Sequence, residues 1–238
     1  MQLLENGARE LGITLDTEQL ERFETYYREL VEWNRKMNLT RIIGYEEVQM
    51  KHFLDSLTVT AAMKQTEDAL RVIDVGTGAG LPGLPLKIAL PGLHLTLLES
   101  TAKKTRFLNH LVEKLGLTDV EIVTGRAEDI ARDDEYREKF DVVLSRAVAS
   151  LPSLVELTMP FCAVGGRFIA QKKGAMDEEL CISMKAIDVM GGRLDGTKQV
   201  SLPAAGDDRV LIVIDKVRLT PPEYPRRAGV PARKPILD

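Results

Sequence analysis

The fold of this chain is decided by residues 71–100, which read RVIDVGTGAGLPGLPLKIALPGLHLTLLES. A short apolar, β-rich run at residues 72–75 leads directly into the glycine turn, GTGAG at residues 76–80. Such a turn is almost free of side chains, so its backbone can approach a ligand closely. The segment after Pro82 is predicted to be helical, and a second apolar strand ends at Glu99, 19 residues beyond the last glycine. That spacing suits a carboxylate that accepts hydrogen bonds from a ribose.

The spacing of the glycines distinguishes between two classes of cofactor. The dinucleotide pattern G-x-G-x-x-G requires a small residue where helix and strand pack tightly, but this chain has Leu81 at that position. Its glycines are instead spaced G-x-G-x-G and follow Asp74, and the resulting D-x-G-x-G-x-G pattern resembles motif I of class I S-adenosylmethionine-dependent methyltransferases. The alternative is a tight turn that binds nothing, and Glu99 at the end of the next strand argues against it.

The composition is that of a globular protein with an uneven distribution of charge. The 238 residues are 44% hydrophobic and 29% charged, enough for one domain with an extension or for two small domains. Residues 1–32 carry eight acids against three arginines, whereas residues 216–238 carry six bases against two acids. The net charge of −4 therefore does not exclude nucleic acid as a partner, because a basic surface can be local.

Cysteine and histidine usage gives no sign of a metal site or a disulfide framework. Cys162 and Cys181 are few and isolated, and His52, His94 and His110 show no ligand spacing. The first residues lack the basic and apolar regions of a signal peptide, and no apolar run is long enough for a membrane span. We therefore expect a cytoplasmic protein without a bound metal and without contact with a membrane.

Residues 1–66 are predicted to form a helical extension packed on the core. An amphipathic helix is indicated around residues 20–31, and a second helix over residues 46–63. The second helix carries His52, Asp55 and Ser56 on one face. A hydrolase triad is not favoured, because a nucleophilic serine usually occupies an exposed strained turn. We interpret these three side chains as a hydrogen-bonded seam against the next domain.

Between these two helices, residues 33–41 read WNRKMNLTR and concentrate Arg35, Lys36 and Arg41 in one short segment. One interpretation is a helix end, where cationic side chains interact favourably with the helix dipole. The other is an edge that contacts RNA. The sequence supports both equally.

From residue 71 onward the pattern alternates between strand and helix. Strands are predicted at residues 72–75, 95–99, 120–124, 140–144, 165–170, 192–200 and 210–217, with helices at 84–88, 103–115, 151–159 and 176–190. Alternating strands and helices imply a mostly parallel sheet, and two late strands without a helix between them imply an antiparallel edge. Ligands of such sheets bind outside the carboxyl ends of the strands, where the glycine turn, Glu99, Ala127-Glu128 and Ser145-Arg146 all fall.

Seven short motifs occur together and in order. They are NLT (38–40), HFLDSL (52–57), DVGTGAGLPGLPL (74–86), LES (98–100), GRAE (125–128), SRA (145–147) and YPRRAG (224–229). From about residue 34 to the C-terminus, the chain closely resembles the bacterial small-subunit ribosomal RNA methyltransferase G family, also called glucose-inhibited division protein B. The resemblance implies an α/β fold: a Rossmann-like class I methyltransferase domain over residues 67–218, the helical extension before it, and a basic, proline-rich tail over residues 219–238.

The resemblance also implies an activity and a cofactor. Members of the family transfer methyl from S-adenosylmethionine, giving S-adenosylhomocysteine, to N7 of guanine 527 in 16S rRNA, in a loop near the decoding centre. The resemblance places five residues around the cofactor: Gly76, Leu81, Ala127, Glu128 and Arg146. The spacing of the glycine turn and of the acid after it adds Gly78, Gly80 and Glu99. Each has a plainer alternative: Leu81 as core, Glu128 as a surface charge, Arg146 as a structural ion pair.

Guanine N7 carries a lone pair and no proton, so the reaction needs no general base. Positioning and desolvation then supply the catalysis, and Arg146 is the residue we expect to face both cofactor and guanine. We expect RNA to be bound by local bases, namely Arg35, Lys36, Arg41, Lys172, Lys173, Arg226, Arg227, Arg233 and Lys234. The partner would be 16S rRNA, either in the small subunit or in an assembly intermediate. We expect the protein to act as a monomer. A small-molecule methyltransferase would not need the basic tail, and a non-catalytic RNA-binding protein would not need the glycine turn.

Overall fold

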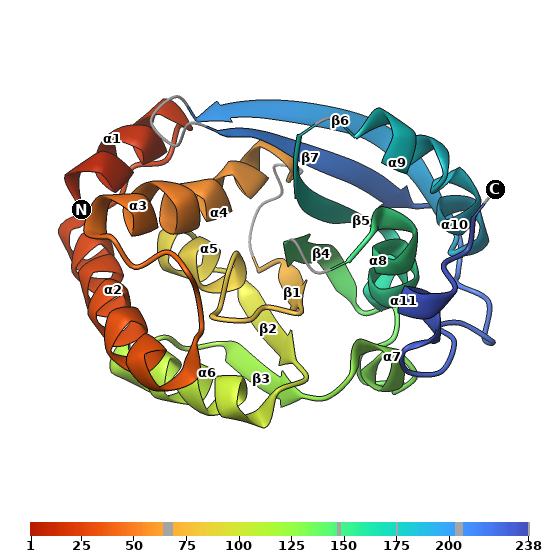
Figure 1. Ribbon diagram of the computed structural model, residues 1–238, viewed down its shortest axis with the longest axis horizontal. Coiled ribbons are helices and arrows are strands. Elements are labelled where there is room, and N and C mark those ends of the chain that lie inside the picture. The colour runs from red at the N-terminus through yellow and green to blue at the C-terminus, as the bar shows by residue number, and fades with distance from the viewer. Residues whose placement is uncertain (64–68, 147–148, 175, 203–206, 238) are drawn as a thin grey trace.

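A seven-stranded sheet lies between two layers of helices (Figure 1). The computed structural model describes residues 1–63, 69–146, 149–174, 176–202 and 207–237. The expected boundary between residues 66 and 67, Ala147 of the SRA motif and the last residue of the tail lie outside the described residues. The described residues form one continuous body around the sheet.

The sheet has the predicted mixed topology. Its strands are β1 (Arg71–Val75), β2 (His94–Glu99), β3 (Val120–Thr124), β4 (Phe140–Arg146), β5 (Cys162–Lys173), β6 (Gly192–Leu202) and β7 (Asp207–Lys216). They lie in the order β3-β2-β1-β4-β5-β7-β6, and β7 runs antiparallel to both of its neighbours. The first five strands are parallel, so their carboxyl ends share one edge. The strand order reverses between β1 and β4, which is where sheets of this kind bind ligands.

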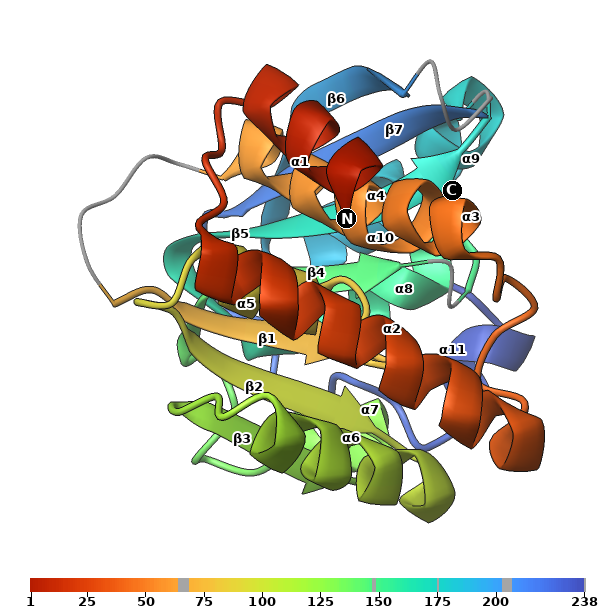
Figure 2. The same cartoon turned by 90° about the vertical axis from the view of Figure 1, so that its left-hand side faces the viewer.

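The helices cover both faces of the sheet. They are α1 (Gln2–Glu10), α2 (Thr17–Met37), α3 (Tyr45–Val48), α4 (Asp55–Leu57), α5 (Gly83–Ala89), α6 (Ala102–Lys114), α7 (Ala127–Ile130), α8 (Leu151–Thr158), α9 (Asp177–Cys181), α10 (Met184–Val189) and α11 (Val230–Arg233). Figure 2 shows α1 to α6 on the face toward the viewer, and Figure 1 shows α7 to α11 on the opposite side of the sheet. The predicted α/β fold class is confirmed.

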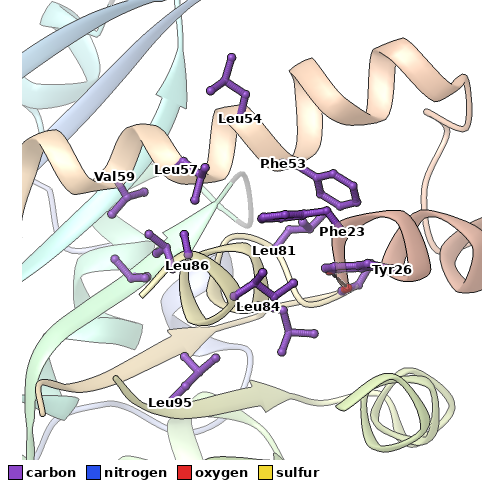
Figure 3. Packing of buried hydrophobic residues seen from close by; sticks show 14 of the residues in the cluster. Phe23, Tyr26, Phe53, Leu54, Leu57, Val59, Leu81, Leu84, Leu86 and Leu95 are labelled. Atoms are coloured by element: carbon purple, nitrogen blue, oxygen red, sulfur yellow. Dashed lines mark hydrogen bonds between the residues drawn. The ribbon is translucent and has the colours of Figure 1, made fainter. Parts of the chain in front are cut away.

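The N-terminal helices share a hydrophobic core with the domain. Phe23 and Tyr26 of α2 each lie 5.0 Å from the ring of Phe53, measured between ring centroids, and all three side chains are fully buried. They pack against Leu81 and Leu84 at the start of α5 (Figure 3). The extension therefore buries its apolar stripe on the same leucines that follow the glycine turn.

Polar contacts fix α2 on the domain. Asp16 caps the helix in a capping box with Gln19. The Gln19 side chain also donates hydrogen bonds to the carbonyl oxygens of Ile88 and Ala89. The Tyr26 hydroxyl donates to the Ala79 carbonyl within the glycine turn, at 2.6 Å. The long helix thus holds both ends of the turn-and-helix unit formed by residues 76–89.

Some elements differ from the sequence prediction. Helix α1 was not predicted, because only Leu4 and Ala8 are buried on it and its stability depends on packing. The helix expected over residues 46–63 is present but has a π-helical segment at Gln49–Leu54 and a 3₁₀ turn at Thr58–Ala62. The helix expected over residues 176–190 is broken into α9 and α10.

Strand β5 also begins earlier than predicted. It starts at Cys162 and not at Gly165, and it runs through Gly165 and Gly166. Gly165 has a φ of +92°, and a Cβ atom on Gly166 would lie 2.7 Å from the Asp141 carbonyl oxygen. The pair accommodates an irregularity in the β4–β5 register rather than a turn.

We expect Phe53→Ala to reduce the free energy of unfolding by about 3–5 kcal/mol, because it leaves a cavity among buried rings. Urea denaturation would measure the change, with Ile43→Ala as a control because Ile43 is 49% exposed. A loss no larger than that of the control would contradict the packing of Phe53 between α2 and the residues that follow the glycine turn.

Candidate functional site

The glycine turn presents its backbone at the carboxyl edge of the sheet. Gly76, Gly78 and Gly80 have φ values of +74°, +62° and +93°, which side chains rarely tolerate. The Gly76 N–H donates to the Leu98 carbonyl, tying the turn to β2. A Cβ atom built on Gly78 would meet only the Gly76 oxygen, 4.0 Å away, so there is open space beside this residue. The turn can therefore receive a ligand against bare backbone.

Glu99 lies where the sequence predicted an acid, at the end of β2. Its side chain is nearly fully buried, and its Oε2 accepts a hydrogen bond from the Gly78 N–H at 3.1 Å. Its Oε1 accepts from the Thr101 N–H at 2.9 Å, and the Lys104 ammonium lies 3.5 Å from Oε2. These contacts orient an acceptor-rich group beside the glycine turn.

The Asp74 side chain hydrogen-bonds to residues within and just after the glycine turn. Its Oδ2 accepts hydrogen bonds from the Thr77 hydroxyl at 2.7 Å and from the Gly83 N–H at 2.9 Å. Its Oδ1 is buried and has no hydrogen-bond partner among the described residues. Burial raises the pKa of the Asp74 carboxyl to about 6, against the opposing effect of these two hydrogen bonds. The residue links both ends of the turn through one oxygen.

The structure supports the plainer alternative for some of the candidate residues and excludes it for others. Leu81 is buried in the main hydrophobic cluster beside Phe53 and Tyr26, as its core alternative requires (Figure 3). Glu128 is not a surface charge: it is 6% exposed, and its Oε1 accepts from the Gly229 N–H at 2.7 Å. Ala127 opens α7 directly after β3 and packs at the edge of the second hydrophobic cluster.

Arg146 ends β4 and forms an ion pair with Asp55 of α4, with 3.1 Å between Nη1 and Oδ2. Asp55 is buried and also accepts a hydrogen bond from Nε of Arg209, a residue of β7. The Asp55 carbonyl oxygen accepts from the Gln171 side chain at 2.7 Å. Of the three side chains predicted to form a seam against the domain, Asp55 makes these contacts. Arg209 and Gln171 were missed, since nothing in the local sequence links them to a residue more than a hundred positions earlier.

His52 and Ser56 differ from the prediction, because their hydrogen bonds lie within the helical extension. The Thr40 hydroxyl lies 2.8 Å from its Nε2, and the Lys51 carbonyl lies 3.1 Å from its Nδ1. Burial lowers the pKa of the imidazole to about 4, and the charge of Arg146 acts in the same direction. The ring is therefore neutral near pH 7. The Ser56 hydroxyl donates to the His52 carbonyl, so these residues form a structural network and not a triad.

The bases predicted to bind RNA fall into two groups. Arg35, Lys36 and Arg41 are exposed at the end of α2 and just after it, and Lys173, Arg227, Arg233 and Lys234 are also exposed. Lys172 is different, because its ammonium donates to the Ala149 carbonyl at 2.7 Å and to Glu179 at 3.0 Å. Arg226 is likewise engaged within the molecule.

The C-terminal tail is pinned to the domain by buried and half-buried groups. Arg226 makes a bidentate ion pair with Glu156, whose side chain is fully buried, with a shortest distance of 2.6 Å. Arg137 donates to the carbonyl oxygens of Thr220, Pro221 and Tyr224. Arg226, which was predicted to bind RNA, therefore has a structural role in holding the tail, and its contact with RNA stays a prediction.

The geometry fits an S-adenosyl cofactor. Open backbone at Gly78, the oriented carboxylate of Glu99 and the unpartnered Oδ1 of Asp74 give acceptors and close approach at one strand edge. Among the described residues, no three His, Cys, Asp or Glu side chains gather into a metal site. Within the same ranges, none of the helices combines the length and the apolar character needed to cross a bilayer.

Comparison with known proteins gives matches over nearly the full chain. A family model described as rRNA small subunit methyltransferase G matches residues 19–205. The ribosomal RNA small subunit methyltransferase G of Dehalococcoides mccartyi (strain CBDB1) is 52% identical over 232 residues, which are 97% of each chain. The protein of that name from Alkaliphilus metalliredigens is 47% identical over 234 residues, covering 98% of each chain.

Solved structures agree on the fold alone. A mutant of MtNAS in complex with S-adenosylmethionine gives a TM-score of 0.55 at 19% identity, covering 90% of this chain and 77% of that chain. A ribosomal protein L11 methylase from Lactobacillus delbrueckii subsp. bulgaricus gives 0.52 at 13% identity, covering 71% of this chain and 79% of that chain.

Asp74→Asn tests the buried acid. Since burial raises its pKa to about 6, the folded state binds more protons than the unfolded state between about pH 4 and pH 6, and ionisation destabilises the fold as pH rises. The asparagine can still accept both hydrogen bonds without this cost. Relative to the natural protein, the variant should gain about 2–3 kcal/mol of unfolding free energy between pH 4 and pH 8. A difference that is constant over this range would contradict the assigned pKa.

Arg226→Ala should reduce the free energy of unfolding by about 3 kcal/mol, because it leaves the buried carboxylate of Glu156 without its cation. Arg227→Ala is the matched control: it removes the same charge one residue away from an exposed position and should change stability by less than about 0.5 kcal/mol. Thermal unfolding of both variants decides the point, and equal losses would remove the pinning role from Arg226.

Proposed function

This chain belongs to the rRNA small subunit methyltransferase G family, and we propose that it methylates N7 of guanine 527 of 16S rRNA from S-adenosylmethionine. The observation that carries the proposal is the match of 52% identity over 97% of both chains. The glycine turn and the bases exposed on several elements support it, since an RNA methyltransferase needs both features. The compartment we propose is the cytoplasm, and the acting form a monomer that meets 16S rRNA within the small subunit or an assembly intermediate.

The residues around the glycine turn would hold the cofactor. Gly76 and Gly78 would offer bare backbone to its methionine portion, and Glu99 would offer a carboxylate to the ribose hydroxyls. Gly80 contributes through the shape of the turn, because Leu84 and Tyr26 fill the space beside it. Ala127 and Glu128 follow β3 at the same edge and would border the adenine, with Glu128 held in place by Gly229. S-adenosylmethionine supplies an electrophilic methyl group on a sulfonium centre. Leu81 contributes indirectly, because its packing against Phe53 and Tyr26 fixes the end of the turn.

Arg146 is the residue we assign to the boundary between cofactor and guanine. It stands at the end of β4, next to β1 in the sheet, and Asp55 limits its movement. Its guanidinium could donate to guanine O6 while leaving N7 unprotonated, which suits a nucleophile that needs no general base. Neutral His52 is occupied by Thr40 and is not required as a base. Catalysis then rests on placement of the reacting atoms, which can supply about 7–11 kcal/mol.

Small ribosomal subunits from a strain that lacks the enzyme provide the decisive substrate. After incubation with the protein and S-adenosylmethionine, the RNA is reduced with borohydride and treated with aniline, which cleaves the chain at N7-methylguanosine. One new cleavage at guanine 527 is expected. Binding of S-adenosylhomocysteine without methylation of subunits or of their free RNA would instead favour a small-molecule methyltransferase.

Arg146→Ala should lower kcat for RNA methylation by about 10²-fold, because the guanine loses its positioning group. The fold should persist, since Asp55 keeps Arg209 as a partner. Arg146→Lys keeps the charge without the planar fork and should be intermediate. Single-turnover rates are measured at saturating cofactor, with melting temperature as the control. An unchanged rate would leave Arg146 with the structural role that its ion pair also permits.

A further inference from the structure

The hydroxyl group of Tyr26 reaches the glycine turn from the helical extension. Tyr26 lies in the middle of α2, and its side chain is fully buried. The hydroxyl donates a hydrogen bond to the Ala79 carbonyl at 2.6 Å, between residues that are 53 positions apart. Burial raises the pKa of the Tyr26 hydroxyl well above its usual range, so the group is a protonated donor near pH 7. Helix α2 therefore supplies a hydrogen-bond donor to the backbone of the turn.

This contact depends on the absence of a side chain at Gly80. A Cβ atom on Gly80 would lie 2.9 Å from the Tyr26 hydroxyl oxygen and 2.5 Å from Cδ1 of Leu84. The hydroxyl thus occupies space that a glycine leaves free. Ala79 is 4% exposed, so water has little access to this residue. Removal of the tyrosine oxygen would leave a buried carbonyl group without that donor, which is costly.

The bond from Tyr26 fixes the orientation of one peptide unit. The Ala79 carbonyl and the Gly80 N–H belong to the same peptide. Tyr26 holds the carbonyl, and the Gly80 N–H donates to the Thr77 carbonyl at 3.0 Å. Because both polar groups of this peptide are bound, its plane has a defined direction within the turn.

Gly78 directly precedes the peptide that Tyr26 holds. Its N–H donates to the Glu99 carboxylate at 3.1 Å, and there is open space beside it. A glycine has few steric limits on its backbone angles, so Gly78 does not hold its own orientation. The peptide that follows it must therefore help to set the direction of Gly78 toward Glu99. These are two of the residues that would hold the cofactor.

We propose that Tyr26 is a positioning residue for the cofactor: through the Ala79 carbonyl it holds the glycine turn in the form that binds S-adenosylmethionine. This inference rests on the proposed function, because it concerns the same cofactor site. The tyrosine acts through the backbone of the turn and does not have to contact the cofactor. The helical extension then has a part in cofactor binding in addition to its part in stability.

Tyr26→Phe tests the proposal, because it removes one oxygen atom and keeps the ring that packs on Phe53. Calorimetric titration of the full chain should show an affinity for S-adenosylhomocysteine about tenfold below that of the natural protein, because a buried carbonyl of the turn loses its donor. In methylation assays on small subunits, KM for S-adenosylmethionine should rise by a similar factor, whereas kcat at saturating cofactor should stay within about twofold. A purely structural role would instead reduce the amount of active enzyme, and hence kcat, with KM and the dissociation constant unchanged.

Gln19→Met is the matched control. Gln19 lies on the same helix and also donates to backbone carbonyls of the domain, those of Ile88 and Ala89, at 2.8 and 3.2 Å. These two residues end α5, at the end of that helix away from the glycine turn. Both variants should lower the melting temperature by about 2–4 °C. Only Tyr26→Phe should weaken the binding of S-adenosylhomocysteine, and an equal loss of affinity in the control would contradict a specific role for Tyr26.

Hydrogen exchange of the free protein tests whether Tyr26 acts through the turn. The N–H groups of Gly80 and Leu81 both donate to the Thr77 carbonyl, and in Tyr26→Phe they should exchange at least about tenfold faster than in the natural protein. Their exchange in Gln19→Met should match that of the natural protein. Lowered affinity with unchanged exchange of these two groups would contradict an action through the turn.

The binding titration also separates this inference from the proposed function. Failure of the natural protein to bind S-adenosylhomocysteine would reject the proposed function, and this inference with it. Binding by the natural protein that Tyr26→Phe leaves unchanged would reject the role of Tyr26 alone and would keep the cofactor site.

Discussion

The buried carboxylate of Asp55 is the interaction on which the arrangement of the site depends. It joins a helix of the N-terminal extension to the ends of β4 and β7 through two arginines. A carboxylate removed from water is costly unless charged hydrogen bonds compensate it, so this contact demands that all three segments meet in one geometry. The orientation of Arg146 at the end of β4 follows from that demand.

Two further buried acids act in the same way at the opposite side of the sheet. Glu128 accepts the Gly229 N–H, and Glu156 accepts the Arg226 guanidinium. The tail has few apolar residues with which to anchor itself, and these polar contacts hold it across α7 and α8. Buried acids thus fix both ends of the chain around the sheet: Asp55 of the extension binds arginines of the domain, and Glu128 and Glu156 of the domain bind the tail.

The chemistry proposed for the site explains why its histidine is inert. Burial keeps His52 neutral, and its Nε2 is hydrogen-bonded to the Thr40 hydroxyl. A histidine that served as a general base would need a ring nitrogen that faces the substrate. Guanine N7 needs no general base, so the demands on the protein are to exclude water and to orient two ligands. The glycine turn would orient the cofactor, and Arg146, which is held by Asp55, would orient the guanine. Both lie at the carboxyl edge of the sheet.

The sequence by itself determined the elements whose signals are local. Strand periodicity, the glycine turn and the acid at position 99 specify a mostly parallel sheet and its ligand edge, because each depends on neighbouring residues. Arg146 and the Ala127-Glu128 pair could be placed at that edge for the same reason. Only the tertiary structure decided what these side chains contact. Arg209 and Asp55 are 154 residues apart, and Arg226 differs from Arg227 only because Glu156 is buried beside it. A charge in the sequence reveals its presence, but its partner and its solvation are set by the packing of distant segments.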